Sequence, residues 1–367
     1  MRAKMAHSVM RFGPWLGLLG SCAALAFALA VARPTAAQTL RPAVVGGAPS
    51  PVDRDAAVLL VYRAPGGEFA YTCSAALVAP NLVVTARHCV SAIDDYNVAC
   101  EADGRQASGS AVGVDRSAER FEVYAGAARP LPSTPSAAKG KSIHHDGAKS
   151  LCGHDLAFIV LDRDVPAARV LPIRMEGPVS VGERFTAVGY GVTKTAAEPP
   201  ARQERSAVAI RQVGPFEGAD REPPVAPRDF LVGESFCQGD SGGPAISDAT
   251  GALIGVATRV TNLDSSATAP WDLCVESARA PRVYAYYTQM GAFASLTRSA
   301  FAAAGREPWL EGRSEPGYPA DDDGCRVGPA YGGKAPGALL LVVAMLLGRR
   351  FSCTVRRSLP WRIGKRR

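Results

Sequence analysis

The stretch FCQGDSGGPAI, residues 236–246, sets one serine, Ser241, between an aspartate and two glycines. Glycine-rich segments of this kind occur in any loop that needs a positive φ or a close backbone approach, so the stretch alone could be an ordinary turn. A hydroxyl is a weak nucleophile near neutral pH, and a catalytic serine needs a base and a third group that orients the base. Whether Ser241 is reactive therefore depends on the rest of the chain.

Candidate bases are few, because the chain has only five histidines. His88 follows a β-branched run in VVTARHCV and stands beside Cys89, which could hold it in place through a disulfide. His144 and His145 lie in a polar stretch, and His154 has the surroundings of a loop residue. The sequence thus favours His88 as the base.

The candidate for the third group is Asp155, which leads directly into the continuous apolar run of DLAFIVL. Burying a carboxylate is costly unless it is paired or hydrogen-bonded, and an imidazole N–H is a suitable partner. We therefore expect Asp155 to orient His88.

The pattern of short segments predicts the fold class. Short β-rich runs separated by Gly, Pro, Asp and Ser cover residues 44–285, which favours an all-β sandwich or barrel. Apolar residues at helical spacing within 287–305 predict one helix that closes the domain. Residues 306–334, rich in Gly, Pro and acid, are predicted to be a linker.

Three segments carry a family resemblance. VVTARHC (83–89), DLAFIVL (155–161) and CQGDSGGP (237–244), in this order, resemble the signature segments of the chymotrypsin/trypsin family of serine proteases. The similarity runs from VVGG at residue 44 to the helix near 304. It implies two antiparallel Greek-key β-barrels with a C-terminal helix, a protein or peptide substrate, and neither a cofactor nor a metal.

The resemblance also implies the role of each site residue. His88 would be the general base and acid, Asp155 would orient it, and Ser241 would attack the carbonyl. The backbone N–H groups of Gly239 and Ser241 would form the oxyanion hole, where one donor contributes roughly 3 to 4 kcal/mol in the transition state. Arg87 departs from the family, in which a small alanine is commoner beside the base.

The cysteines indicate export and disulfides. Apart from Cys22, Cys325 and Cys353 near the ends, the body holds six, an even number that is typical of disulfide-bonded secreted chains. No CxxC pair is present, which argues against a zinc site. The resemblance implies two of the pairs, and the third then joins the cysteines that are left over: Cys73–Cys89, Cys237–Cys274 and Cys100–Cys152.

Activation in this family uses a new N-terminal Ile or Val whose ammonium pairs with the aspartate before the nucleophile. Val44 and Asp240 match these positions, and a buried Asp240 without a cation would be strongly penalised. Ala43 precedes Val44 where Arg or Lys is usual. Either a protease unlike trypsin removes a pro-segment at 38–43, or the protein is regulated in another way.

The predicted specificity pocket lacks the acid of trypsins. By resemblance Ser235 forms its base, Val260 lies over its mouth, and Arg282 stands where glycine usually leaves the pocket open. A buried guanidinium prefers a carboxylate partner, so one hypothesis is a preference for Asp or Glu before the scissile bond. The alternative is that Arg282 turns outward or fills the pocket.

The positive net charge of +7 belongs to the ends of the chain. Residues 1–37 and 349–367 together carry twelve basic residues and no acid, which leaves the body with more acidic than basic residues. A nucleic-acid-binding function is therefore not supported.

Both ends resemble export signals. Residues 1–37 have a basic front, an apolar run and a small-residue exit, the pattern of a cleaved signal peptide, although a buried helix is the alternative. DDDGC, which ends at Cys325, with the short apolar segment 335–350 and its arginines, resembles the sorting signals of secreted myxobacterial proteins. This resemblance implies surface anchoring through the membrane, with a basic tail at 351–367. The alternative is a weak core helix and a disordered tail.

Two functions remain after these steps. The first is a secreted or surface-anchored serine endopeptidase, expected to be a monomer. The second is a non-catalytic binding protein on the same scaffold. Such proteins usually lose a triad residue, whereas this chain retains all three.

Overall fold

The computed structural model describes most of the chain between residues 44 and 318. The described residues are 44, 47–95, 97–109, 111–193, 198–219, 222–263, 273–276 and 282–318. They all belong to the first of two compact units, Met1–Asp321. The predicted signal peptide, pro-segment, anchor and tail lie outside the described residues, as does Cys325. In the part that is described, no helix is both long and apolar enough to cross a bilayer.

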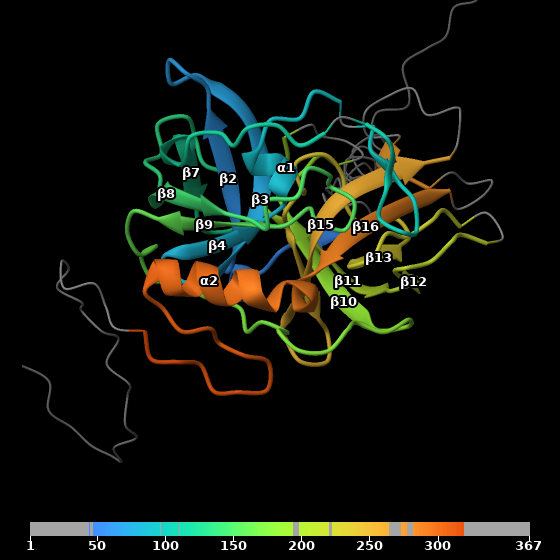
Figure 1. The fold of residues 1–367 in the computed structure, drawn as a ribbon. Helices are drawn as coiled ribbons and strands as arrows, with labels where there is room; N and C mark the ends of the chain where they lie inside the picture. The colour runs from blue at the N-terminus through green and yellow to red at the C-terminus, as the bar shows by residue number, and fades with distance from the viewer. Residues whose placement is uncertain are drawn as a thin grey trace, which may run out of the picture. The chain divides into compact units, whose positions relative to one another are not determined.

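The first half of the domain is a closed antiparallel barrel (Figure 1). Its strands pair in the order β2-β3-β4-β9-β8-β7. The strand bounds are β2 Ala57–Arg63, β3 Phe69–Ala79, β4 Leu82–Thr85, β7 Phe121–Tyr124, β8 Ala138–His144 and β9 Ala157–Leu161. Both β4 and β9 are buried along their whole length, which explains why their sequences are continuous apolar runs rather than alternating ones.

The second half is an eight-stranded antiparallel sheet with the order β1-β11-β10-β14-β15-β16-β13-β12. Aromatic rings fill its core: Phe230 stacks on Tyr287, and Phe185 and Phe236 meet Tyr287 edge-on. The strand bounds are β1 Ala48–Pro49, β10 Arg184–Gly189, β11 Gln203–Ala209, β12 Gln212–Val213, β13 Asp229–Val232, β14 Pro244–Ser247, β15 Leu253–Asn262 and β16 Val283–Gln289.

The predicted closing helix is present. After the 3-10 turn η4 (Met290–Phe293), helix α2 (Ala294–Ala304) buries Ala300 and Phe301 in a core cluster that it shares with strands of the first barrel. It ends at Gly305, whose left-handed φ of 67° is the usual helix stop. The predicted fold class, all-β with two barrel-like halves and a C-terminal helix, is confirmed.

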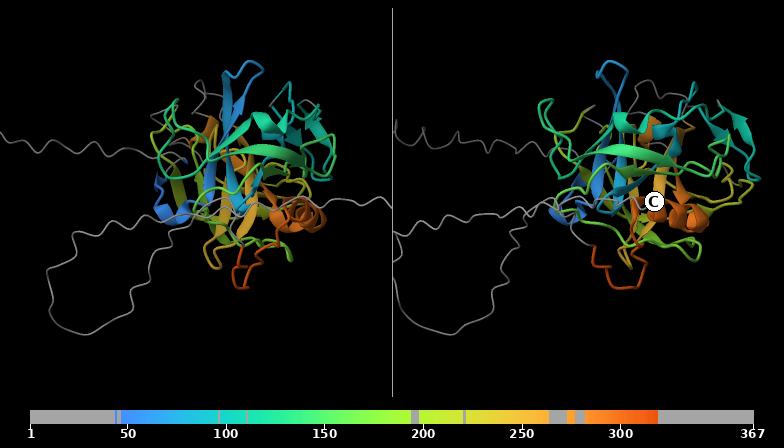
Figure 2. Two further views of the ribbon diagram at one scale, coloured as in Figure 1. Left: turned by 90° about the vertical axis from the view of Figure 1, so that its left-hand side faces the viewer. Right: turned by 60° about the vertical axis from the view of Figure 1, so that its left-hand side comes forward.

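An inserted segment follows the short helix α1 (Arg87–Val90) and precedes the 3-10 turn η2 (Ala118–Arg120). It contains the hairpin of β5 (Ala99–Cys100) and β6 (Gln106–Ser108). Figures 1 and 2 show this segment, coloured teal, beside the second sheet, although it starts from the first barrel. Two contacts support that placement: the Cys100–Cys152 disulfide packs on Ala226, and Gly104 lies against Pro227. The insertion thus bridges the two halves near the entrance to the site described below.

The first part of the predicted linker, residues 306–318, contacts the domain. In the structure the backbone N–H of Ile173 donates to the carbonyl of Trp309 at 2.8 Å. Arg174 forms ion pairs of 2.7 Å with both Glu183 and Glu311, which raise the pKa of its guanidinium. Residues 306–318 therefore belong to the folded domain, because these charges fasten them to it.

Candidate active site

Strand β4 leads directly to the short helix that carries His88. The buried strand ends at Thr85, and α1 then turns the chain so that the His88 side chain faces a cavity. The disulfide Cys73–Cys89 ties α1 to β3. The hydroxyl of Tyr71 donates to the Cys89 carbonyl at 2.6 Å. Cys89 therefore holds the short helix through both its side chain and its backbone.

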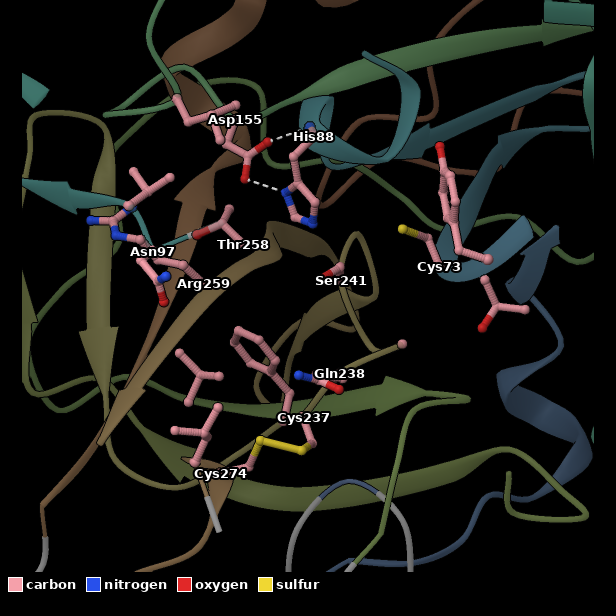
Figure 3. A pocket seen from close by; sticks show the side chains of 18 residues that line it. Cys73, His88, Asn97, Asp155, Cys237, Gln238, Ser241, Thr258, Arg259 and Cys274 are labelled. Atoms are coloured by element: carbon pink, nitrogen blue, oxygen red, sulfur yellow. Dashed lines mark hydrogen bonds and ion pairs between the residues drawn. A yellow bond between two sulfur atoms is a disulfide. The ribbon is translucent and has the colours of Figure 1, made fainter. Parts of the chain in front are cut away.

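Asp155 holds His88 at two points. The Nδ1 atom of His88 lies 2.8 Å from Oδ2 of Asp155, and the His88 backbone N–H donates to Oδ1 at 2.9 Å (Figure 3). Asp155 is only 2% exposed. Because an ionised carboxylate can only accept, Nδ1 carries the proton in this arrangement, which leaves Nε2 as the acceptor. Figure 3 shows that Nε2 edge turned towards the side of the cavity on which Ser241 lies.

Ser241 sits in a turn that requires its glycines. Gly239 has a φ of +91°, and a Cβ there would meet Gly191 Cα at 2.9 Å. A Cβ on Gly242 would come within 2.0 Å of Thr85 Oγ1. The glycines therefore let this turn pack directly against β4, next to the helix that carries the imidazole.

The three predicted catalytic residues line one cavity of about 490 Å³. His88 and Asp155 enter from the first barrel, and Ser241 and Gly239 from the turn that precedes β14. An imidazole oriented by a carboxylate beside a serine hydroxyl is the arrangement that activates an alcohol for attack on a carbonyl.

Asp240 is buried and forms no ion pair with a described residue, although the charge of Arg129 acts to lower its pKa. Its carboxylate accepts from Gly191 N–H at 2.7 Å and from Cys237 N–H at 2.9 Å, and its exposed fraction is 1%. Burial raises its pKa to about 7. Val44 is fully buried in the apolar core of the second sheet.

Of the predicted specificity residues, only Val260 lines the cavity. Ser235 is fully buried behind it and is not a lining residue, and its hydroxyl accepts from Tyr287 OH at 3.1 Å. Phe236 and Leu273 complete an apolar wall.

Arg282 does not line the cavity, in agreement with the alternative that its side chain turns outward. The side chain is exposed and donates to the Leu263 carbonyl at 3.1 Å. The register of β15 and β16 explains this position, because Val260 pairs with Ala285, and Arg282 precedes the strand. The three tyrosines of VYAYYT offer more than one alignment with the family pattern, and only strand pairing selects between them.

Arg259 is a cavity residue that the sequence did not reveal. Its guanidinium pairs with Asp229 at 2.9 Å and lies 4.0 Å from the centre of the Tyr286 ring. Asp229 is fully buried, and burial raises its pKa. The sequence did contain a signal for Asp229, the partner of Arg259. Asp229 leads into the apolar run DFLV just as Asp155 leads into its own strand.

The three disulfides join the cysteines in the expected pairs. Cys237–Cys274 lies in the cavity wall. Potential ligand atoms of Cys73, His88 and Cys89 lie within 4.8 Å of one another. Because the two sulfurs are bonded to each other, they are not thiolates and do not form a metal site.

The fold and the cavity define a serine-type protease scaffold of the two-barrel class. The family model described as Trypsin matches residues 44–280, and the chain belongs to this family.

Two curated relatives are similar to parts of the chain. The CLIP domain-containing serine protease B4 of Anopheles gambiae is 23% identical over 239 residues, which are 58% of this chain and 61% of that protein. Its B10 counterpart from the same organism is 26% identical over 235 residues, which are 56% and 59% of the two chains. The chain thus spans about three fifths of the length of these relatives. A solved structure titled "Structure of GrC" has 16% identity and a TM-score of 0.46, over 71% of this chain and 100% of that one.

Proposed function

We propose that this protein is a serine endopeptidase in which Ser241 is the nucleophile, His88 the general base and acid, and Asp155 the group that orients the imidazole. The double hydrogen bond between His88 and Asp155, in the cavity that Ser241 lines, carries the proposal. Membership of the Trypsin family supports it.

The proposed reaction proceeds through an acyl-enzyme. His88 takes the Ser241 proton at Nε2 while the oxygen attacks the peptide carbonyl, and the N–H groups of Gly239 and Ser241 stabilise the oxyanion. Asp155 stabilises the resulting imidazolium. His88 then protonates the leaving amine, the C–N bond breaks, and a water molecule releases the acid by the same steps in reverse.

A fluorophosphonate probe tests this proposal. Wild-type protein, processed at Val44, is expected to be labelled, whereas Ser241→Ala is not. The exposed Ser180→Ala serves as the matched control and should label normally. Absence of labelling in correctly processed wild-type protein would favour the alternative, a non-catalytic binding protein on the same scaffold.

We also propose activation by cleavage before Val44. The carboxylate of Asp240 is buried with two backbone donors, and it forms no ion pair with a described residue. A new ammonium at Val44 would supply that partner. N-terminal sequencing of active protein is expected to begin at Val44, and activity in a chain that still carries residues 38–43 would contradict the proposal.

The cavity supports cleavage after uncharged residues. Arg282 is exposed, and the charge of Arg259 is already paired with Asp229. The rest of the wall includes the apolar residues Phe236, Val260 and Leu273. On peptides that end in Asp, Arg or an aliphatic residue before the scissile bond, we expect fastest turnover of the aliphatic series. Fastest cleavage after Arg would contradict this assignment.

For localisation we propose export and attachment at the cell surface, with protein or peptide substrates in that compartment. The three disulfides support an oxidising environment. Cys325 and the segment 335–350 would provide the anchor. Replacement of Cys325 by Ser should release the protease domain into the medium without loss of labelling.

A further inference from the structure

Arg87 immediately precedes His88 on α1 and is only 1% exposed. Its Nη1 donates to the Ala148 carbonyl at 2.6 Å and lies 3.6 Å from Oδ1 of Asp146. Its Nε lies 3.5 Å from the Ser91 hydroxyl. A buried cation is tolerated only with such partners, so the burial of the Arg87 side chain depends on these hydrogen bonds and this ion pair.

Asp146 belongs to a wider charge cluster. Its Oδ2 lies 2.5 Å from Nδ1 of His154 and 3.7 Å from Nη1 of Arg228. Arg228 also approaches Nδ1 of His154 at 3.2 Å. The carboxylate therefore joins two arginines and the histidine that adjoins the catalytic aspartate in sequence.

A second carboxylate completes the cluster. The Ser91 hydroxyl donates to Oδ1 of Asp115 at 2.7 Å, and Nε2 of His145 lies 2.7 Å from Oδ2. Burial lowers the pKa of Arg87, and the negative charges of Asp115, Asp146 and Asp155 act in the opposite direction.

These contacts connect the elements that carry the catalytic pair. Arg87 shares α1 with His88, and its bonds to Ala148 and Asp146 reach the segment that runs from β8 to Asp155. Neither contact involves the hydrogen bond between His88 Nδ1 and Asp155 Oδ2 itself. Arg87 therefore fixes α1, which carries His88, relative to the segment that leads to Asp155.

We infer that Arg87 is a positioning residue for the His88–Asp155 pair, because its contacts hold α1, which carries His88, against the segment that leads to Asp155. This inference rests on the proposed peptidase function. The charged and titratable groups around Arg87 are Asp115, Asp146, Asp155, His145, His154 and Arg228.

Two substitutions separate the contacts that Arg87 makes from the charge of its guanidinium. Arg87→Met removes both, so we expect kcat to fall roughly 10- to 100-fold with KM within about twofold, because misplacement of a catalytic group costs that much. Arg87→Lys keeps the charge but not the fork of donors, so kcat should recover only in part, again with little change in KM.

The matched control is Arg202→Met. Arg202 is also fully buried and pairs with an aspartate, Asp55, at 2.9 Å, but it immediately precedes β11 of the second sheet. The variant should lose thermal stability as Arg87→Met does and keep the wild-type kcat.

A direct measurement avoids dependence on turnover. The histidines of the full chain can be labelled, and the NMR signals of the His88 ring at one fixed pH should shift in Arg87→Met but not in Arg202→Met. Asp146→Asn, a change at a partly exposed side chain, removes one of the contacts of Arg87 and should shift the same signals. Unchanged His88 signals in Asp146→Asn would overturn the inference even if Arg87→Met did not fold. Inactive wild-type protein with shifted signals in these variants would overturn only the peptidase proposal.

Discussion

At the scale of single residues, the site depends on which nitrogen of His88 carries the proton. Asp155 accepts from both the ring and the backbone N–H of His88, so the tautomer and the ring position are set by one carboxylate. The sequence predicted this role from an acid at the start of a buried run. Only the fold brings His88 and Asp155 into one cavity, because 67 residues separate them in the sequence.

The first prediction concerns Asp155→Asn. An amide has the same shape but can donate to Nδ1, so the proton moves to Nε2 and His88 can no longer accept from Ser241. We expect kcat to fall about 10⁴-fold with little loss of stability. Stopped-flow acylation with an activated ester, compared across pH, measures the effect. A drop of less than tenfold would argue against the orienting role.

The second prediction concerns Gly239→Ala. The new Cβ would meet Gly191 Cα at 2.9 Å at a φ of +91°, which displaces the N–H proposed for the oxyanion hole. A loss of roughly 10² to 10³ in kcat is expected. Gly67→Ala is the control, since its φ is +88° but nothing lies within 4 Å of the added carbon. Equal losses in both variants would show that backbone strain alone is responsible.

At the scale of elements, the inserted hairpin of β5 and β6 shapes the cavity. Asn97 and Val98 line it from the insertion, and Leu151 lines it from the segment before Asp155. The sequence separates His88 from Asp155 by 67 residues, which leaves room for such a hairpin. The position of the hairpin beside the second sheet was not visible in the sequence, because a disulfide and contacts with distant residues hold it there.

The third prediction tests that hairpin. Replacing Cys100 and Cys152 together by Ser removes a cross-link across 52 residues, which costs about 4 kcal/mol in the loop-entropy description. We expect a lower thermal midpoint and a KM raised severalfold, with labelling of Ser241 retained. Calorimetry and peptide kinetics on the same samples measure both effects. An unchanged KM would show that the hairpin does not border the substrate.

At the scale of the whole molecule, the unprocessed chain holds a buried acid, Asp240, that forms no ion pair with a described residue. The pKa of Asp240 is raised to about 7 by burial, so the folded state binds its proton more tightly than the unfolded state does. The free energy of unfolding should therefore decrease as the pH rises from about 4 to about 7 and then level off.

The fourth prediction follows from the direction of this pH dependence. In the unprocessed chain, Asp240→Asn should remove the decrease and raise stability at pH 8 by on the order of 2 to 4 kcal/mol. Urea unfolding at pH 5 and pH 8 measures it, with the exposed Asp53→Asn as control. After cleavage before Val44 the wild-type protein should gain stability at pH 8, and the Asn variant should not.

The pairing of the disulfides was implied by the family resemblance, with the third pair formed by the cysteines left over. The sequence by itself determined the fold class and the catalytic candidates through local patterns: apolar runs that begin with an acid, a histidine next to a cysteine, and a serine among glycines. Each pattern depends on residues that are adjacent in the chain, so it can be read without knowledge of distant contacts.

Tertiary structure alone decided the pocket and the surroundings of Arg87. The exposed position of Arg282 and the presence of Arg259 in the cavity depend on how β15 pairs with β16, where a shift of one residue would turn every side chain to the opposite face. Arg87 appeared in the sequence only as a departure from the family pattern. Its partners Asp146 and Asp115 lie far along the chain, and only folding brings their charges to it.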